Sequence, residues 1–342
     1  MSSTVLDVGG PVHVAQLGTP GDPDAPVTVC LHGLGGSHLN WLAVAPGLAE
    51  TSRVVAVDLV GHGRTPAAGR APDLGGHVAV VAGVLDRLDA GPVTLVGNSM
   101  GGLVAALVAA EHPDKVERLV LVNAALPAPR PVVPHPRIVA NFVACAVPGL
   151  GEWFLTARRR RTTPEQSVRR VLQMCCVDPG RVEAAVVDAH VALTASIDRA
   201  AADGAYLTSA RSLTAALLRP AAVRRALDRI TAPTLLLHGE RDVLVPVEVA
   251  RQVQQDHPAW TLEVAPDIGH VPMLEAPEWT VERIGAFGEA AGRPGATVPG
   301  PPAGQPGPEV APSGPVTSEA PSSGSGPSSS PEPAPSHPSP SA

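Results

Sequence analysis

Six short runs of nearly unbroken apolar residues recur along the chain, and they constrain its fold more than any other feature. Each run is apolar at consecutive positions, which is typical of parallel strands covered on both faces. The stretches between them, such as 73–88 and 100–111, carry the apolar spacing or the composition of helices. Strands that alternate with helices predict an α/β fold with a doubly wound, mostly parallel sheet. The six runs cover residues 27–31, 54–57, 93–96, 119–122, 234–237 and 261–264.

One long segment interrupts this alternation. Residues 127–225 open with a proline-rich connection and contain no convincing strand. We therefore predict that they form a helical cap inserted into an α/β core made of residues 1–126 and 226–290. Residues 5–17 are predicted as an antiparallel hairpin at one edge of the sheet.

The composition changes abruptly after residue 290. Residues 291–342 consist almost entirely of Pro, Gly, Ser and Ala. Such a segment cannot bury enough apolar surface to offset the entropy lost on ordering, so we predict a disordered tail. It is either a passive solvated segment or a ligand for a proline-binding partner of the SH3 type.

Charge and hydropathy limit the remaining partners. The formal net charge of -7 gives no reason to expect nucleic-acid binding. No apolar run reaches the ~18 residues that cross a bilayer, and residues 1–10 do not resemble a signal peptide. We therefore expect a cytoplasmic protein without a membrane partner.

The four cysteines, two of them adjacent, are predicted to be reduced and buried. No metal ion or cofactor is expected, and the oligomeric state is left open.

The sharpest local motif is Gly97-Asn98-Ser99-Met100-Gly101, which fits G-x-S-x-G. It follows the run 93–96 and opens the predicted helix 100–111, the context that a nucleophile elbow requires. The glycines remove side chains that would clash where the chain turns sharply. Ser99 is therefore the candidate nucleophile, and because a serine hydroxyl is a weak nucleophile it needs a base.

His270 is the candidate base among the 12 histidines. It follows the run 261–264 on a loop at the carboxyl end of a strand, where open α/β sheets gather their active sites. Asp242 follows the run 234–237 in the same way, and it is the candidate acid that fixes the histidine tautomer. The order Ser, Asp, His along the chain is the one that α/β-fold hydrolases use. Glu240 is the nearest competing carboxylate, and Asn123 is a poor substitute because it is uncharged.

Two main-chain amides are predicted to form an oxyanion hole. One is the N–H of Met100, directly after the nucleophile. The other is the N–H of Leu34, in the glycine-rich loop after the run 27–31. Glycines in this loop let an amide approach the substrate closely.

Together these motifs resemble the α/β-hydrolase superfamily. The resemblance implies an eight-stranded sheet, a cap where the helical insert falls, and hydrolysis through an acyl-enzyme. It also implies that His32 and His62 are structural loop residues. The matching stretches are 31–36, 58–65, 97–102, 238–242 with Pro246, and 269–270.

Three functions remain open from the sequence. The leading hypothesis is a serine hydrolase that cleaves a small-to-medium carboxylic ester. The stretch 97–102 is also similar to hydrolases that cleave carbon–carbon bonds of ring-fission products, the meta-cleavage type. Those enzymes usually carry Trp after the catalytic histidine, whereas this chain has Val271, as esterase-like and haloperoxidase-like members do. The third hypothesis is a non-catalytic scaffold or binding protein on the same fold.

The predicted cap carries a basic run and a few aromatic residues. The arginines at 158–161, 169 and 170 are interpreted as a solvated helix face, with an anion-attracting rim for a carboxylate substrate as the alternative. Phe142, Trp153 and Phe154 are predicted to pack within the cap rather than to line an acyl pocket.

Overall fold

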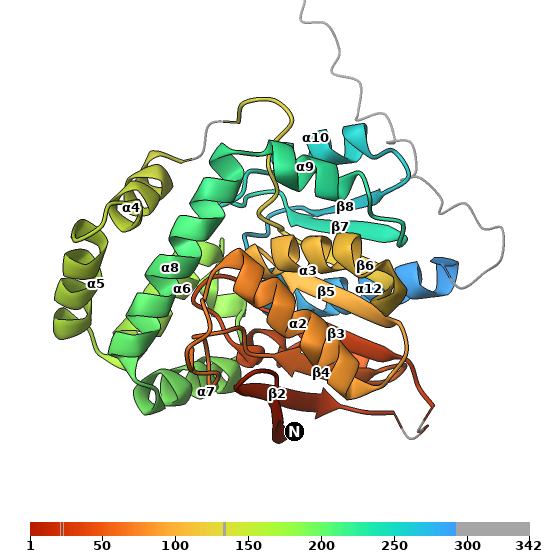
Figure 1. The fold of residues 1–342 in the computed structure, drawn as a ribbon, viewed down its shortest axis with the longest axis horizontal. Coiled ribbons are helices and arrows are strands. Elements are labelled where there is room, and N and C mark those ends of the chain that lie inside the picture. The colour runs from red at the N-terminus through yellow and green to blue at the C-terminus, as the bar shows by residue number, and fades with distance from the viewer. Residues whose placement is uncertain (21, 23, 133–134, 292–342) are drawn as a thin grey trace, which may run out of the picture. The chain divides into compact units, whose positions relative to one another are not determined.

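An eight-stranded sheet forms the centre of the molecule (Figure 1). The computed structural model describes residues 1–20, 22, 24–132 and 135–291. The strand order is β1-β2-β4-β3-β5-β6-β7-β8, with β1 and β2 antiparallel to their neighbours and all other pairs parallel. The strands are β1 (Ser2–Asp7), β2 (Pro11–Gly18), β3 (Val27–Leu31), β4 (Arg53–Val57), β5 (Val93–Asn98), β6 (Val116–Val122), β7 (Thr234–Gly239) and β8 (Thr261–Ala265).

This architecture confirms the predicted doubly wound, mostly parallel sheet and its edge hairpin. All residues of β3 and β5 are buried, which explains why these strands read as continuous apolar runs rather than as alternating ones. Fully burying one Val or Leu side chain contributes about 1.5–3 kcal/mol relative to leaving it exposed. The short apolar runs therefore decide which segments take the central positions.

Helices cover both faces of the sheet. On one face lie α2 (Leu74–Leu88), α3 (Met100–Glu111) and α9 (Ala221–Leu227), whose apolar residues belong to one core cluster. On the other lie α1 (Ala45–Leu48), α11 (Pro272–Glu275) and α12 (Pro277–Ala291). Helix α10 (Val247–Asp256) packs beside β7 and β8. Three 3-10 turns, His38–Trp41 (η1), Pro113–Lys115 (η2) and Pro179–Arg181 (η3), complete the connections within the described residues.

Two helix predictions can be compared in detail. Asp73 stands at the start of the helical stretch 73–88, where an aspartate is a predicted N-cap, and it does cap α2: its side chain accepts a hydrogen bond of 2.8 Å from the Gly76 amide. The amphipathic stretch 274–287, which follows the candidate base, predicts a single last helix, and this prediction is wrong in its extent. It is two helices, α11 and α12, which are separated at Ala276 (φ −144°) and restarted by Pro277, a residue suited to the first turn of a helix.

Helices α4 (Pro136–Ala146), α5 (Leu150–Arg161), α6 (Pro164–Cys175), α7 (Ala184–Ser196) and α8 (Arg199–Leu218) are inserted between β6 and β7 (Figure 1). They occupy most of the predicted cap, 127–225, whose final residues lie in α9. The inner faces of α4, α5 and α8 form a small core of their own, made of Cys145, Leu155, Leu207 and Ala210.

Three sequence predictions concern chain ends, cysteines and membranes. The predicted tail, 291–342, lies outside the described residues from 292 on. The four cysteines are free and buried, as expected. Within the described residues no single helix is long and apolar enough to cross a membrane.

Candidate active site

Ser99 occupies a sharp turn between β5 and α3. Its backbone lies in the left-handed region at φ 54° and ψ −118°, which is rare for a residue with a side chain. Such strain persists only where the surroundings enforce it, and it is concentrated at functional sites. The enforcing contacts are main-chain hydrogen bonds. The Ser99 amide donates to the Val122 carbonyl at 3.0 Å, and the Ser99 carbonyl accepts from Ala125 at 3.0 Å.

The flanking glycines allow this turn. A Cβ on Gly97 would lie 2.3 Å from the Gly101 carbonyl oxygen, and one on Gly101 would lie 2.3 Å from the His32 carbonyl oxygen. Both distances are far below van der Waals contact with a backbone atom that cannot move aside. The glycines are therefore required by the close approach of the elbow to its neighbours.

Asp242 and His270 are brought together from two loops at the carboxyl ends of β7 and β8. Oδ2 of Asp242 lies 2.6 Å from Nδ1 of His270, and both residues are buried. An ionised carboxylate only accepts hydrogen bonds, so Nδ1 carries the proton and Nε2 is left as the basic nitrogen. This is the tautomer that a general base for Ser99 needs.

The other oxygen of Asp242 has a structural task. Oδ1 accepts hydrogen bonds from the amides of Leu244 and Val245, at 2.7 and 3.0 Å. The carboxylate therefore fixes its own turn before α10 and also faces the histidine. The competing carboxylate, Glu240, is exposed and lies 3.8 Å from Arg251.

Asn123 also contacts the acid, a role that the sequence did not reveal. Its Nδ2 donates to Oδ2 of Asp242 at 2.7 Å and to the Gly269 carbonyl at 3.2 Å, and its Oδ1 accepts from the Gly239 amide at 3.3 Å. Asn123 is fully buried, with φ 46°. The only sequence signal was its position at the end of β6, beside the strand that leads to Asp242.

Electrostatics keep the acid ionised. Burial alone raises the pKa of Asp242, but the charge and hydrogen bond of His270, with His238 and Asn123, outweigh it and lower the pKa below its usual value. Burial lowers the pKa of His238, whose Nε2 donates to the Val245 carbonyl at 2.8 Å. A neutral His238 leaves His270 as the stronger partner of Asp242.

The two predicted oxyanion donors lie on suitable backbone. Met100 is the first residue of α3, and the first amides of a helix have no intrahelical acceptor. The Leu34 amide lies in the turn 33–36, and in the described part of the chain it donates to no main-chain carbonyl. A Cβ on Gly33 would lie 3.0 Å from Cβ of Ser99, so this loop passes directly beside the elbow.

Ser99 and His270 are linked through a neighbour rather than directly. The Asn98 side-chain amide donates to the His270 carbonyl at 3.1 Å and to the Val122 carbonyl at 3.1 Å. The Ser99 hydroxyl forms no side-chain hydrogen bond among those found between described residues. Catalytic hydrogen bonds of unliganded enzymes are often open and tighten on substrate binding, so this arrangement is compatible with a triad.

Comparison with known proteins places this geometry in a family. The family model for the alpha/beta hydrolase fold matches residues 26–152. The pimeloyl-(acyl-carrier protein) methyl ester esterase of Aromatoleum aromaticum is 33% identical over 266 residues, which cover 74% of this chain and 94% of the relative. The chain belongs to the alpha/beta hydrolase family.

Two further comparisons agree with the family. The dihydrolipoyllysine-residue acetyltransferase component of the acetoin cleaving system of Pseudomonas putida is 28% identical over 76% of this chain, which spans 62% of that relative. Among solved structures, a membrane phospholipase A described as a bacterial virulence factor matches with a TM-score of 0.62 and 26% identity, covering 85% of this chain and 86% of that one. The alpha/beta hydrolase fold therefore extends over nearly all the described residues.

The inserted helices of this alpha/beta hydrolase touch the histidine loop. The His270 amide donates to the Cys175 carbonyl at 2.6 Å, at the end of α6. The buried Glu275 accepts from the Gly269 amide through one oxygen and from the Asp178 amide through the other, each at 2.8 Å. The insert is thus coupled to the residues on both sides of the candidate base.

The histidines of the glycine-rich loops have structural roles, as the resemblance implied. Nδ1 of His32 donates to the Gly33 carbonyl at 2.7 Å, and its Nε2 accepts from the Leu59 amide at 3.0 Å. Burial, with the charge of His62, lowers the pKa of His32 to about 4. Burial also lowers the pKa of His62. Neutral rings that bridge two loops are positioning groups rather than bases.

One cluster has the composition of a metal site. His13, His38 and Asp58 are buried, with ligand atoms within 4.8 Å of one another. The Asp58 carboxylate, however, already accepts from the amides of His38 and Arg64, at 2.6 and 2.9 Å, and lies 3.0 Å from Nδ1 of His38. These partners use the lone pairs that a metal ion would need. The cluster is therefore a hydrogen-bonded junction of strand β2, the turn η1 and the loop after β4, which residue spacing could not reveal.

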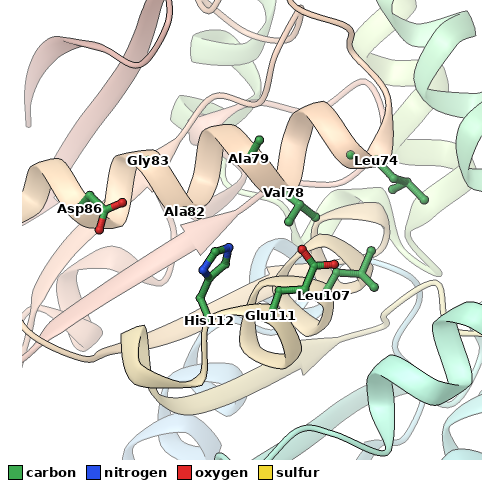
Figure 2. Close-up of a pocket in the computed structure, with 10 residues that line it drawn as sticks. Leu74, Val78, Ala79, Ala82, Gly83, Asp86, Leu107, Glu111 and His112 are labelled. Atoms are coloured by element: carbon green, nitrogen blue, oxygen red, sulfur yellow. The ribbon is translucent and has the colours of Figure 1, made fainter.

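A groove of about 430 Å³ lies between α2 and α3 (Figure 2). It contains neither the candidate triad nor the candidate oxyanion donors, so we assign it no role in the reaction. Its lining residues are Leu74, Gly75, Val78, Ala79, Ala82, Gly83, Asp86, Leu107, Glu111 and His112.

The aromatic residues of the insert differ from expectation. Phe142 and Phe154 are partly buried, but Trp153 is 68% exposed, so the prediction that it packs within the cap is wrong. Trp153 projects from the face of α5 opposite to the buried Leu155, which occupies the helix–helix contact instead. The basic run on the same helix is only partly paired: Arg159 bridges to Asp203 at 2.7 Å.

Proposed function

We propose that this chain is a serine hydrolase that cleaves a small-to-medium carboxylic ester through an acyl-enzyme on Ser99. The observation that supports this most is the buried pair of His270 and Asp242, 2.6 Å apart, on a loop hydrogen-bonded to the residue before Ser99. The relative from Aromatoleum aromaticum is named for a methyl ester, which supports an ester as substrate.

The proposed reaction follows from the roles of these groups. The Ser99 oxygen attacks the ester carbonyl while Nε2 of His270 takes the hydroxyl proton, and Asp242 stabilises the imidazolium that forms. The amides of Leu34 and Met100 hold the oxyanion of the tetrahedral intermediate. His270 then gives the proton to the departing alcohol. A water molecule, deprotonated by the same nitrogen, then attacks the acyl-enzyme, and His270 returns this proton to the Ser99 oxygen as the acid is released.

Labelling of the nucleophile tests the proposal. The chain is incubated with a fluorophosphonate probe, and the modified peptide is identified by mass spectrometry. We expect label on Ser99 and turnover of short-chain p-nitrophenyl esters. The variant Ser99→Ala should abolish this turnover. The control Ser3→Ala, on an exposed strand at the sheet edge, should retain both. Absence of label and of turnover in the folded protein would reject the proposal and favour the scaffold hypothesis.

Carbon–carbon hydrolysis is the second candidate, which the stretch 97–102 favours. It would use the same Ser99 and His270 on a dienone-type diketo acid. A ring-fission product incubated with the same preparation separates the two reactions. Esters that turn over beside an inert ring-fission product support the ester hydrolase, and the opposite pattern supports the alternative.

A further inference from the structure

A stripe of exposed apolar side chains runs along the outer faces of α4 and α5. Trp153 is 68% exposed and Val143 is 56% exposed. On α4 and just beyond it the valines are spaced four residues apart, so they lie on one face of the helix. The stripe, which we call the cap stripe, consists of Val139, Val143, Val147, Leu150 and Trp153.

The opposite faces of these helices are already occupied. Cys145 of α4 and Leu155 of α5 pack against Leu207 and Ala210 of α8. In Figure 1 helix α8 lies between this pair and the sheet. The cap stripe is therefore turned away from the hydrolase core. Single exposed apolar residues are normal on a protein surface, but several of them on two consecutive helices favour an interaction surface.

Positive charge adjoins the cap stripe. Arg160 follows Trp153 by seven residues and Arg161 follows Leu150 by eleven, so each lies within about 20° of that partner around the helix. Both arginines are exposed, and neither forms an ion pair within the described residues. The two glutamates of α5 and α6 are already paired, Glu152 with Arg211 and Glu165 with Arg169. The surface is thus locally cationic in a chain whose formal net charge is -7.

We propose that the cap stripe docks on the surface of an anionic lipid bilayer. An exposed tryptophan with aliphatic neighbours on one face, flanked by unpaired arginines, is the composition of helices that lie in the membrane interface. Helices α4 and α5 meet at a bend of 114°, and only together do they reach the length and hydropathy of a membrane span, which suits lying on a bilayer rather than crossing it. This docking departs from the expectation that the chain has no membrane partner, which was based on the lack of an apolar run long enough to span a bilayer.

Vesicle co-sedimentation of the full chain tests this docking, and it does not depend on the proposed function because no turnover is measured. Phosphatidylcholine vesicles with and without phosphatidylserine are compared at low and high salt. Binding is expected only with phosphatidylserine and should weaken with salt, because a basic residue near an anionic surface contributes roughly a five-fold gain in affinity. The tryptophan emission of the chain, to which four tryptophans contribute, should shift to the blue on binding, and this shift should be absent in Trp153→Phe.

Two sets of variants separate the apolar and the charged contributions. Val143→Glu and Trp153→Ser should abolish binding, whereas Arg160→Gln with Arg161→Gln should weaken it about 30-fold at low salt. The matched controls are Val5→Glu, on the exposed edge strand β1, and Arg225→Gln with Arg229→Gln, on exposed arginines near α9. These controls should bind like the original chain, and melting curves verify that each variant is folded.

Three results would overturn the proposal. The first is binding no stronger with phosphatidylserine than without it. The second is binding that the cap-stripe variants leave unchanged. The third is the absence of vesicle binding together with a concentration-dependent dimer in sedimentation equilibrium that Trp153→Ser abolishes. In that case a second copy of the chain, rather than a bilayer, would cover the cap stripe.

Discussion

The side-chain amide of Asn123 donates a hydrogen bond of 2.7 Å to Oδ2 of Asp242. The same carboxylate oxygen faces His270 at 2.6 Å, so three side chains from three successive strand ends meet at one atom. Because the amide of Asn123 stabilises the ionised form of the acid, it contributes to the lowered pKa of Asp242. Asn123 is thus a positioning residue for the proposed triad.

Replacing Asn123 by alanine should raise the pKa of Asp242 and lower activity. A hydrogen bond to a charged group contributes about 1.5–3 kcal/mol, so kcat/KM for a short-chain ester should fall by roughly ten-fold or more. The acid limb of the pH–rate profile should move to higher pH, since the ionised carboxylate loses a donor. The control Asn40→Ala removes an amide that contacts Ser37 instead. A profile unchanged in Asn123→Ala would contradict this role.

Asp242→Asn should leave the fold intact and nearly abolish turnover. By analogy with serine protease triads, kcat should fall roughly 10⁴-fold because the amide no longer fixes the histidine tautomer. Steady-state kinetics on p-nitrophenyl esters measures the loss. Glu240→Gln, which changes an exposed carboxylate two residues away, is the matched control and should behave like the original chain. Equal losses in both variants would show that Asp242 is not the triad acid.

Gly33→Ala should damage catalysis more than stability. The added Cβ would lie 3.0 Å from Cβ of Ser99 and 3.1 Å from Oδ1 of Asn98, so the loop must shift by a few tenths of an ångström. Removing one oxyanion donor costs about 10²–10³ in kcat, and a displaced Leu34 amide should cost up to that amount. Gly204→Ala in α8 meets nothing within 4 Å and should stabilise the protein by about 0.5–1 kcal/mol without changing kcat. Kinetics and urea unfolding of both variants check the contrast.

Most of the sheet and the triad candidates were predictable because their signals are local. Buried parallel strands require unbroken apolar runs, and the elbow requires Gly97 and Gly101 at fixed offsets from Ser99. The Ser, Asp, His order then selected Asp242 and His270 from many carboxylates and histidines.

The supporting contacts were not predictable, because they join residues far apart in the chain. Asn123 is 119 positions from Asp242, and Glu275 is 97 positions from Asp178. Neither contact leaves a pattern in the sequence. The exposure of Trp153 was missed for a related reason: an aromatic residue on a helix is assigned to the core by default, and only the packing of Leu155 shows which face is inside.

Buried neutral histidines should make stability fall in mild acid. Burial, with the charge of His62, lowers the pKa of His32 to about 4 and that of His77 to about 3. Below the ordinary histidine pKa of about 6.5, these histidines become protonated in the unfolded chain but stay neutral in the folded chain. The free energy of unfolding is therefore highest above that pH. It decreases as the pH falls towards 4, by about 3 kcal/mol for His32 alone.

Urea unfolding at a series of pH values measures this dependence. The unfolding free energy should be steady above the ordinary histidine pKa and should decline steeply below it. His77→Gln, which keeps a polar group beside Ser209, should reduce the slope. A free energy that stays constant down to a pH of about 4.5 would contradict the prediction.

Glu275 connects the histidine loop to the inserted helices. Its two oxygens accept from the amides of Gly269 and Asp178, each at 2.8 Å, and the side chain is almost fully buried. Arg181 lies 3.9 Å away and supplies the nearest positive charge. Both carboxylate oxygens of Glu275 must act as acceptors at the same time, because leaving one of these buried amides unpaired would destabilise the fold by about 1–3 kcal/mol.

Glu275→Gln keeps the volume of the side chain but turns an NH₂ group towards one of these two amides. We expect unfolding free energy to fall by about 1–3 kcal/mol, and kcat to fall roughly ten-fold because the backbone before His270 loses an anchor. Glu278→Gln, in the exposed first turn of α12, is the matched control and should change neither quantity. If Glu275→Gln lowered stability but left kcat and its pH profile unchanged, the residue would hold the insert in place without positioning the base.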